Sequence, residues 1–236
     1  MGQAPSPAGA NYRGYGGPRL DQYFPLAVIE NHARKTLRLV ADLSGGKISY
    51  PLEAERLVRE LFQFDVFYDD GTIMDQIDPL LVGALYPEGM VCPATGSDRV
   101  IMVNDAPRFS RVTTSFTILH EVGHLLLHHP LDTTAGVAEA YCRTKEGHPT
   151  WSRVPPREWQ AGRLAGEMLM PKELVTRVLD GIKPPEVVDL ATYGPYFRKV
   201  FDVSQAAMEK RLADRSYSSV SGMYPFADVS ETRGSV

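Results

Sequence analysis

The segment His120-Glu121-Val122-Gly123-His124 constrains the fold of this chain more than any other feature. It lies in an apolar run, with Ser115–Leu119 before it and Leu125–Leu127 after it. Residues four apart on an α-helix share one face, so the run predicts a helix with both imidazoles on one side. Two such imidazoles can bind one Zn²⁺, and the adjacent Glu can take a proton from water at the ion. The pattern predicts metal-assisted hydrolysis, most often of a peptide bond.

Composition narrows the classes of protein that this chain can belong to. The 236 residues are 43% hydrophobic and 23% charged, which is ordinary for a soluble globular protein. The net charge of −4 gives no electrostatic footprint for nucleic acid or for an anionic membrane, so neither partner is expected. Two cysteines, Cys92 and Cys142, cannot form a disulfide framework, which favours the reducing cytoplasm.

The chain is expected to form one domain between two tails. No apolar run approaches the roughly 20 residues that span a bilayer. Residues 1–20 are rich in Gly, Pro and Ala without the apolar core of a secretory signal, so they are predicted to be a disordered tail. Residues 21–215 are assigned to the domain, with a helix-turn-helix-like segment at about 195–215, and residues 216–236 to a C-terminal tail.

Local patterning predicts both helical and strand-like segments along the chain. The pattern predicts helices at 22–42, 51–62, 158–170, 173–179, 197–201 and 204–212, and strands at 65–68, 81–86, 90–92 and 99–104. Residues 131–157 lack periodicity and read as a long loop, a feature that is usually functional or mobile.

Two histidines do not complete a catalytic zinc site, which needs a third protein ligand. His128 lies on the same helix face but about 12 Å from His120 along the axis, too far to share an ion. The longer motif with a third histidine is excluded, because Leu127 and Pro130 occupy its remaining positions. Three carboxylates remain candidates: Glu158, Glu167 and Glu139. Glu158 opens a helix whose small residues would allow close approach to another helix: Ala161, Gly162, Ala165 and Gly166.

Several separated segments resemble the ImmA/IrrE family of metallo-endopeptidases. These are Thr117–His128, Tyr141–Arg143, Glu158–Ala161, Leu169–Pro171 and Phe201–Ser204. The resemblance implies an α+β fold with a zincin-like core, in which a small β-sheet packs on the motif helix and further helices follow toward the C-terminus. It also implies that Glu158 is the third metal ligand. Position 162, commonly Asn or Asp in that family, is Gly here, which puts a contact that orients a ligand histidine in doubt.

The resulting hypothesis is a zinc-dependent endopeptidase, with Mn²⁺ as an alternative ion. His120, His124 and Glu158 would hold the ion and Glu121 would act as general base. Tyr141 and His148 are candidates for stabilising the oxyanion or contacting substrate. Known members of the family cleave helix-turn-helix transcriptional regulators and relieve repression of mobile elements or stress genes, so a repressor is the expected protein substrate.

Two other functions remain open from the sequence. One is a non-proteolytic metal-binding regulator whose C-terminal helices contact DNA or a partner protein. Residues 198–215 hold five basic and three acidic side chains, a weak excess that a solvated helix face explains equally well. The other is the peptidase half of a toxin–antitoxin or phage-repressor pair, which keeps the chemistry and changes the partner.

Overall fold

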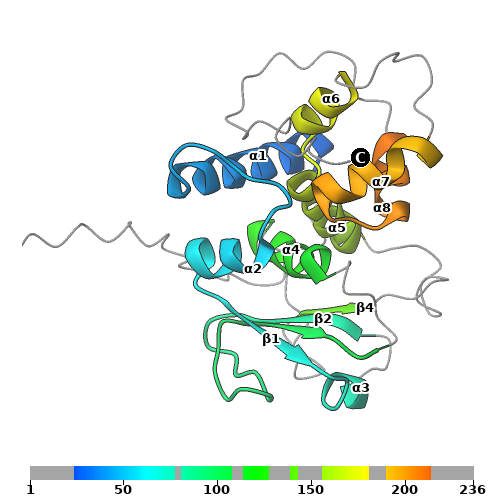
Figure 1. Cartoon of the computed structure of the whole chain (residues 1–236). Coiled ribbons are helices and arrows are strands. Elements are labelled where there is room, and N and C mark those ends of the chain that lie inside the picture. The colour runs from blue at the N-terminus through cyan, green and yellow to red at the C-terminus, as the bar shows by residue number, and fades with distance from the viewer. Residues whose placement is uncertain are drawn as a thin grey trace, which may run out of the picture.

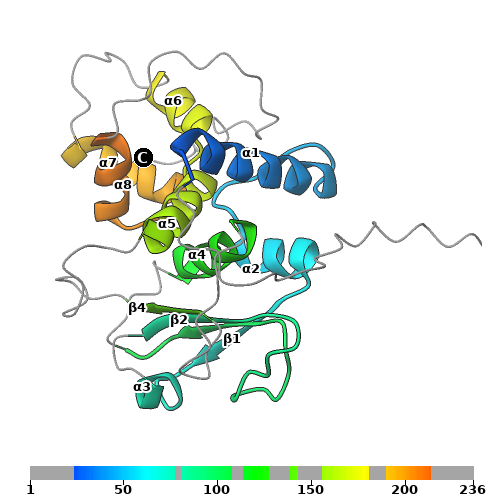
Figure 2. The same ribbon diagram turned by 180° about the vertical axis from the view of Figure 1, so that it is seen from behind.

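The computed structural model describes residues 24–77, 81–107, 114–127, 139–142, 156–180 and 190–213. Within these ranges the chain is α+β, with a small mixed sheet on one side and a stack of helices on the other (Figures 1 and 2). The helix α4 (Thr114–Leu126) lies next to the sheet, and α5 (Pro156–Leu169) packs on α4. Among the described helices, none combines the length and apolar character needed to cross a membrane.

The sheet has four strands in the order β1-β3-β2-β4. These are β1 (Asp65–Asp69), β2 (Leu81–Tyr86), β3 (Val100–Asn104) and β4 (Glu139–Cys142). β1 pairs with β3 in parallel, while β2 is antiparallel to both β3 and β4. Every residue of β2 and β3 is buried, as expected for inner strands covered on both faces.

The two faces of the sheet pack against different cores. On β3, Ile101 and Val103 belong to the large helix-side core, whereas Val100 and Met102 belong to a smaller far-side core next to α3 (Met74–Ile77). This alternation follows from the two-residue period of a strand. β2 contributes to both cores as well, and its pairing with β4 shifts register between Leu81 and Gly83.

The helix-side core extends from the sheet to the last helices. It includes residues of α1 (Leu26–Leu43), which packs on α5, and of α2 (Ala54–Leu57), which continues into the π-helix η1 (Val58–Phe62). It also includes residues of α6 (Lys172–Asp180), α7 (Leu190–Phe201) and α8 (Gln205–Ala213). A single core therefore ties the N-terminal helix to the C-terminal pair.

Local sequence signals explain several helix boundaries. Pro156 is the first residue of α5, where its missing N–H costs nothing, and Pro171 follows its end. Asp202 ends α7 with a φ of 49°, and the Ser204 hydroxyl caps α8 by accepting a hydrogen bond from the Ala207 N–H at 3.2 Å. The two helices around a short turn that the sequence predicts are confirmed.

Two predictions about the sheet are wrong. Residues 90–92 form no strand: the Met90 N–H bonds back to the Pro87 carbonyl and the Cys92 N–H to the Ser97 carbonyl, which makes this a turn region. Val91 is 61% exposed, so the apolar run that suggested a strand is not buried throughout. The segment assigned to a long loop contains the edge strand β4, which is too short for periodicity to reveal.

Candidate metal centre

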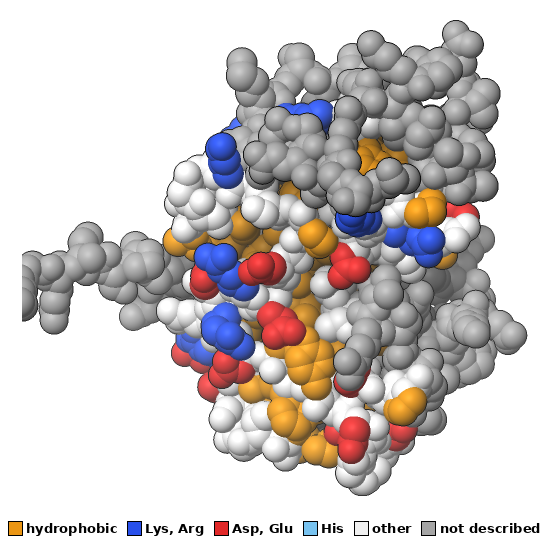
Figure 3. Space-filling view, in the orientation of Figure 1, with side chains coloured by type: hydrophobic (Ala, Val, Ile, Leu, Met, Phe, Trp, Pro, Cys, Tyr) orange, Lys and Arg blue, Asp and Glu red, His pale blue; other side chains and the backbone are white. Residues whose placement is uncertain are grey.

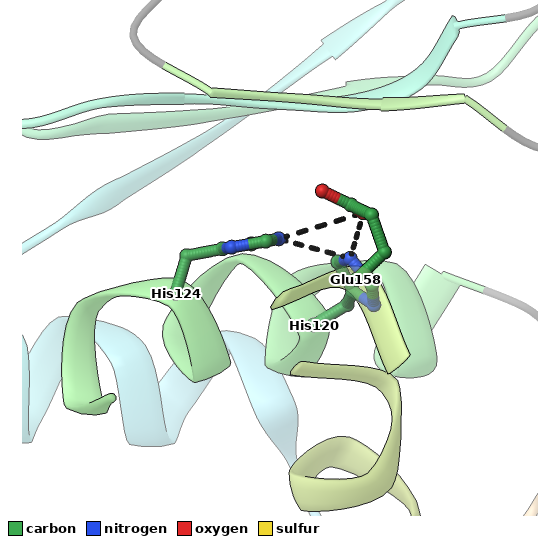
Figure 4. Close-up of side chains that lie close together, drawn as sticks. All are labelled: His120, His124 and Glu158. Carbon is green, nitrogen blue, oxygen red and sulfur yellow. Dashed lines mark hydrogen bonds and ion pairs between the residues drawn. The ribbon is translucent and has the colours of Figure 1, made fainter. Parts of the chain in front are cut away.

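Two neighbouring helices bring together three side chains that could hold a metal ion. His120 and His124 project from α4, and Glu158 projects from the first turn of α5, so that all three meet on the side of α4 that faces the sheet (Figure 4). One nitrogen or oxygen atom from each residue lies within 4.8 Å of the others, and all three residues are buried. The structure therefore brings together the three residues that the sequence analysis favoured.

The distances between these atoms suit a small divalent ion. Nε2 of His120 lies 3.1 Å from Nε2 of His124 and 3.1 Å from Oε2 of Glu158. Nε2 of His124 lies 3.7 Å from the same Glu158 oxygen. Ligands on a tetrahedral ion at about 2.1 Å are separated by about 3.4 Å. The observed distances bracket this value, and two imidazoles with one carboxylate are a ligand set that Zn²⁺ accepts.

The surroundings of Glu158 keep its carboxylate charged. Burial alone would raise the pKa of Glu158, but hydrogen bonds from the side chains of His120 and His124 hold this pKa well below its usual range. The guanidinium of Arg157 also lies near, with Nε 3.7 Å from Glu158 Oε1, a neighbour that the sequence analysis did not single out. A charged carboxylate is the form that binds a metal ion.

A close helix contact places Glu158 at this distance. A Cβ atom added to Gly123 would lie 2.8 Å from Cα of Ala161 and 3.0 Å from its carbonyl oxygen, closer than real Cβ atoms come. The absence of a side chain at Gly123 thus lets α4 and α5 touch through their backbones. The sequence predicted close approach from the small residues of α5, but the partner glycine inside the motif was missed.

The rival carboxylates have other surroundings. Glu167 is buried and forms a two-point ion pair with Arg211, whose Nη1 and Nη2 atoms each lie 2.5 Å from one carboxylate oxygen. Arg163 lies 3.0 Å from the same carboxylate. Glu139 belongs to β4, and nothing is described of its side chain. Glu167 is therefore committed to a salt bridge, which leaves Glu158 as the carboxylate at the histidine pair.

Glu121 is fully buried on α4, on the side next to β2. An added Cβ on Gly83 of β2 would lie 2.9 Å from Glu121 Oε1, so this carboxylate lies directly against the strand. Sequence reasoning missed Gly83, although a lone glycine in an apolar strand often marks close approach of another group.

Other predicted residues are only partly described or not described. Tyr141 has its backbone in β4, while its side chain, His128 and His148 lie outside the described residues. Gly162 lies beside the site: a Cβ there would be 3.7 Å from Nδ1 of His120, an ordinary contact distance. The proposed oxyanion role of Tyr141 and His148 stays a prediction.

The α+β fold and the buried His–His–Glu group define the class of this protein, which has a candidate metal centre between a pair of helices and a small sheet. The chain belongs to the Peptidase M78 family, because the IrrE N-terminal-like domain of that family matches residues 87–213. This match confirms the family that the sequence motifs predicted.

No curated protein matches the chain. Among solved structures it is similar to a Mycobacterium tuberculosis transcriptional regulator, at 14% identity and a TM-score of 0.43. That similarity covers 82% of this chain and 53% of the regulator, so the chain spans about half the length of that protein.

Proposed function

We propose that this protein is a zinc-dependent endopeptidase with a zincin-like core. The observation that carries the proposal is the meeting of His120, His124 and Glu158 within 4.8 Å, next to the buried Glu121. The Peptidase M78 match supports the peptidase class. We further propose that residues 21–215 act as one catalytic domain, which the shared helix-side core from α1 to α8 supports.

Each residue has a distinct role in the proposed reaction. His120, His124 and Glu158 would hold Zn²⁺, or Mn²⁺ in its place. When bound, the ion supplies a Lewis acid that polarises the scissile carbonyl and makes water in the site more acidic. Glu121 takes the proton from the attacking water and delivers it to the leaving amine. Burial of these side chains keeps bulk water from screening their interactions.

The proposed substrate is a helix-turn-helix transcriptional repressor whose cleavage relieves repression. This proposal rests on the family resemblance, and a phage-repressor or toxin–antitoxin partner would leave the chemistry unchanged. A cytoplasmic location, expected from the two cysteines, also stays a prediction.

A DNA-binding regulator is a weaker candidate. Arg211, one of the five basic residues of the C-terminal segment, is buried against Glu167 and cannot reach a phosphate. On the face shown in Figure 3, basic and acidic side chains of the described residues are interspersed rather than gathered by sign. Both observations weigh against a basic DNA-binding face there.

The test uses a helix-turn-helix repressor as candidate substrate, chosen by searching the genes next to this one for a small repressor-like reading frame. The two purified proteins are incubated with Zn²⁺ or Mn²⁺ and the fragments are mapped by mass spectrometry. We expect one or a few cleavage sites, and we expect Glu121→Gln to lower the rate by about 10²–10⁴-fold while retaining metal. Glu158→Ala should lose metal by elemental analysis. Undiminished cleavage by Glu121→Gln would refute the assignment of the base.

A further inference from the structure

Gly83 lies where the sheet meets the motif helix. A Cβ atom built on Gly83 falls 2.5 Å from Cγ2 of Thr117 and 2.9 Å from Oε1 of Glu121. Real Cβ atoms essentially never come this close to another heavy atom. Thr117 and Glu121 lie one turn apart on α4 and are 1% and 0% exposed. The two side chains of α4 therefore fill the space that a side chain at position 83 would need.

Backbone conformation does not explain this glycine. Gly83 does not have a positive φ, so other residues could adopt its backbone conformation. It pairs with Val103 of β3 and with Tyr141 of β4 in the interior of the sheet. Glycine inside a strand costs about 0.5–1 kcal/mol relative to alanine. Space for the side chains of α4 is the reason that remains.

We infer that Gly83 is a positioning residue for Glu121. The bare backbone of β2 lets the Glu121 carboxylate lie against the strand, and the strand in turn limits where that carboxylate can move. This inference rests on the proposed function, in which Glu121 is the base. It adds a residue from β2, outside the region of the family match, to the machinery of the site.

A methyl group at position 83 would act mainly on Glu121. The carboxylate is the far end of a flexible side chain and can swing away, whereas the short, β-branched Thr117 is restricted to two favoured rotamers in a helix. A general base must lie within hydrogen-bond reach of the proton it takes, and a displacement of about 1 Å can cost about 10²-fold in rate. The three atoms nearest to the added Cβ belong to Thr117 and Glu121 and not to the proposed metal ligands, so metal binding should survive.

The first experiment measures hydrolysis of a quenched-fluorescent peptide that spans the mapped cleavage site. Gly83→Ala should lower kcat by about 10–100-fold, with KM and the Zn²⁺ dissociation constant within about twofold of wild type. In the Glu121→Gln background, Gly83→Ala should add little, because the two changes act through one group. Gly166→Ala is the matched control, since an added Cβ there meets nothing within 4 Å.

A second variant distinguishes steric crowding of Thr117 from displacement of the Glu121 carboxylate. Thr117→Ser removes the methyl nearest to the new Cβ, so Gly83→Ala/Thr117→Ser should regain the thermal stability of wild type while kcat stays low. Recovery of kcat in this double variant would overturn the inference, because Thr117 rather than Glu121 would then carry the effect. Additive losses with Glu121→Gln would overturn it as well.

A third measurement needs no turnover. Acetohydroxamate binds a protein-held ion and donates a hydrogen bond to a neighbouring carboxylate, and its binding to the cobalt-loaded protein is followed by visible absorption. Gly83→Ala and Glu121→Gln should each weaken this binding about tenfold. Unchanged affinity in Gly83→Ala would overturn the inference. Failure of wild type to cleave any peptide would count against the proposed function instead, and this measurement would still decide the role of Gly83.

Discussion

At the scale of single residues, one glycine beside the motif helix and one within it make room for different neighbours. Gly83 makes room for Glu121 on the sheet side, and Gly123 makes room for the backbone of Ala161 on the α5 side. Both are required by contact with another element rather than by an unusual backbone angle. The helix α4 is thus held at a short distance from each of its two neighbours.

Gly123→Ala should push α5 away from α4 and move Glu158 from the histidines. We expect a loss of about 1–3 kcal/mol in the free energy of unfolding from overpacking, together with weaker Zn²⁺ binding. Urea unfolding and metal titration check both effects. Gly166→Ala should be neutral or stabilising by up to about 1 kcal/mol, because alanine is the better helix former. Equal effects of the two substitutions would contradict the close contact.

Tyr86→Phe is expected to stabilise the protein by about 0.5–1 kcal/mol, since among the described residues no group bonds to this buried hydroxyl. Burial, helped by the charges of Cys92 and Asp69, raises the pKa of Tyr86 to about 12. Between about pH 10 and that value the unfolded chain ionises first, so wild type should lose stability there as pH rises. Unfolding curves at pH 8 and pH 11 should show a larger advantage of the variant at pH 11.

At the scale of elements, α8 is fastened to α5 by a buried charge pair. Arg211 contacts both carboxylate oxygens of Glu167, and its Nε donates to the Met170 carbonyl at 3.0 Å. Arg163 joins the pair from α5 itself. The last helix is therefore linked to the helix that carries Glu158.

Arg211→Met should cost about 3–5 kcal/mol in the free energy of unfolding, because it leaves Glu167 buried without its main partner. The double variant Arg211→Met/Glu167→Leu should recover much of this loss, since the buried carboxylate is removed together with its main partner, while Arg163 keeps Glu30 at 3.9 Å. The control is Arg56→Ala, which breaks an exposed pair with Glu60 and should leave stability nearly unchanged. Unfolding in urea followed by circular dichroism gives all three values; a loss no greater than that of the control would refute the role of the pair.

The sequence predicts contacts between residues that are close along the chain better than contacts between distant residues. The pairing of His120 with His124 follows from the period of one helix, and the structure confirms it. The choice of Glu158 as third ligand depended on the family resemblance, because the spacing of residues within each helix does not give the distance between two helices. Gly83 was missed because its contact runs from a strand to a helix far along the chain. The strand predicted at residues 90–92 was wrong because its hydrogen bonds are made locally instead.

At the scale of the whole molecule, metal binding is expected to be linked to folding. Zn²⁺ at 100 times its dissociation constant should raise the free energy of unfolding by about 2.7 kcal/mol, and a chelator should remove this gain. Because the pKa of Glu158 is held low, its carboxylate keeps the charge that metal binding requires as pH falls. Thermal unfolding of wild type and Glu158→Ala, with and without Zn²⁺, measures this; equal shifts in both proteins would place the ion elsewhere.

The strand order has a practical consequence for the design of truncated forms of this protein. The family match begins at residue 87, immediately after β2 ends, while β1 and α1 also precede it. A fragment cut at that boundary would keep β3 and β4, which are not neighbours in the sheet, and would discard the strand that joins them. The fragment would contain the HExxH motif and Glu158 but no intact sheet on which these residues could assemble. The unpaired edges of β3 and β4 would promote aggregation.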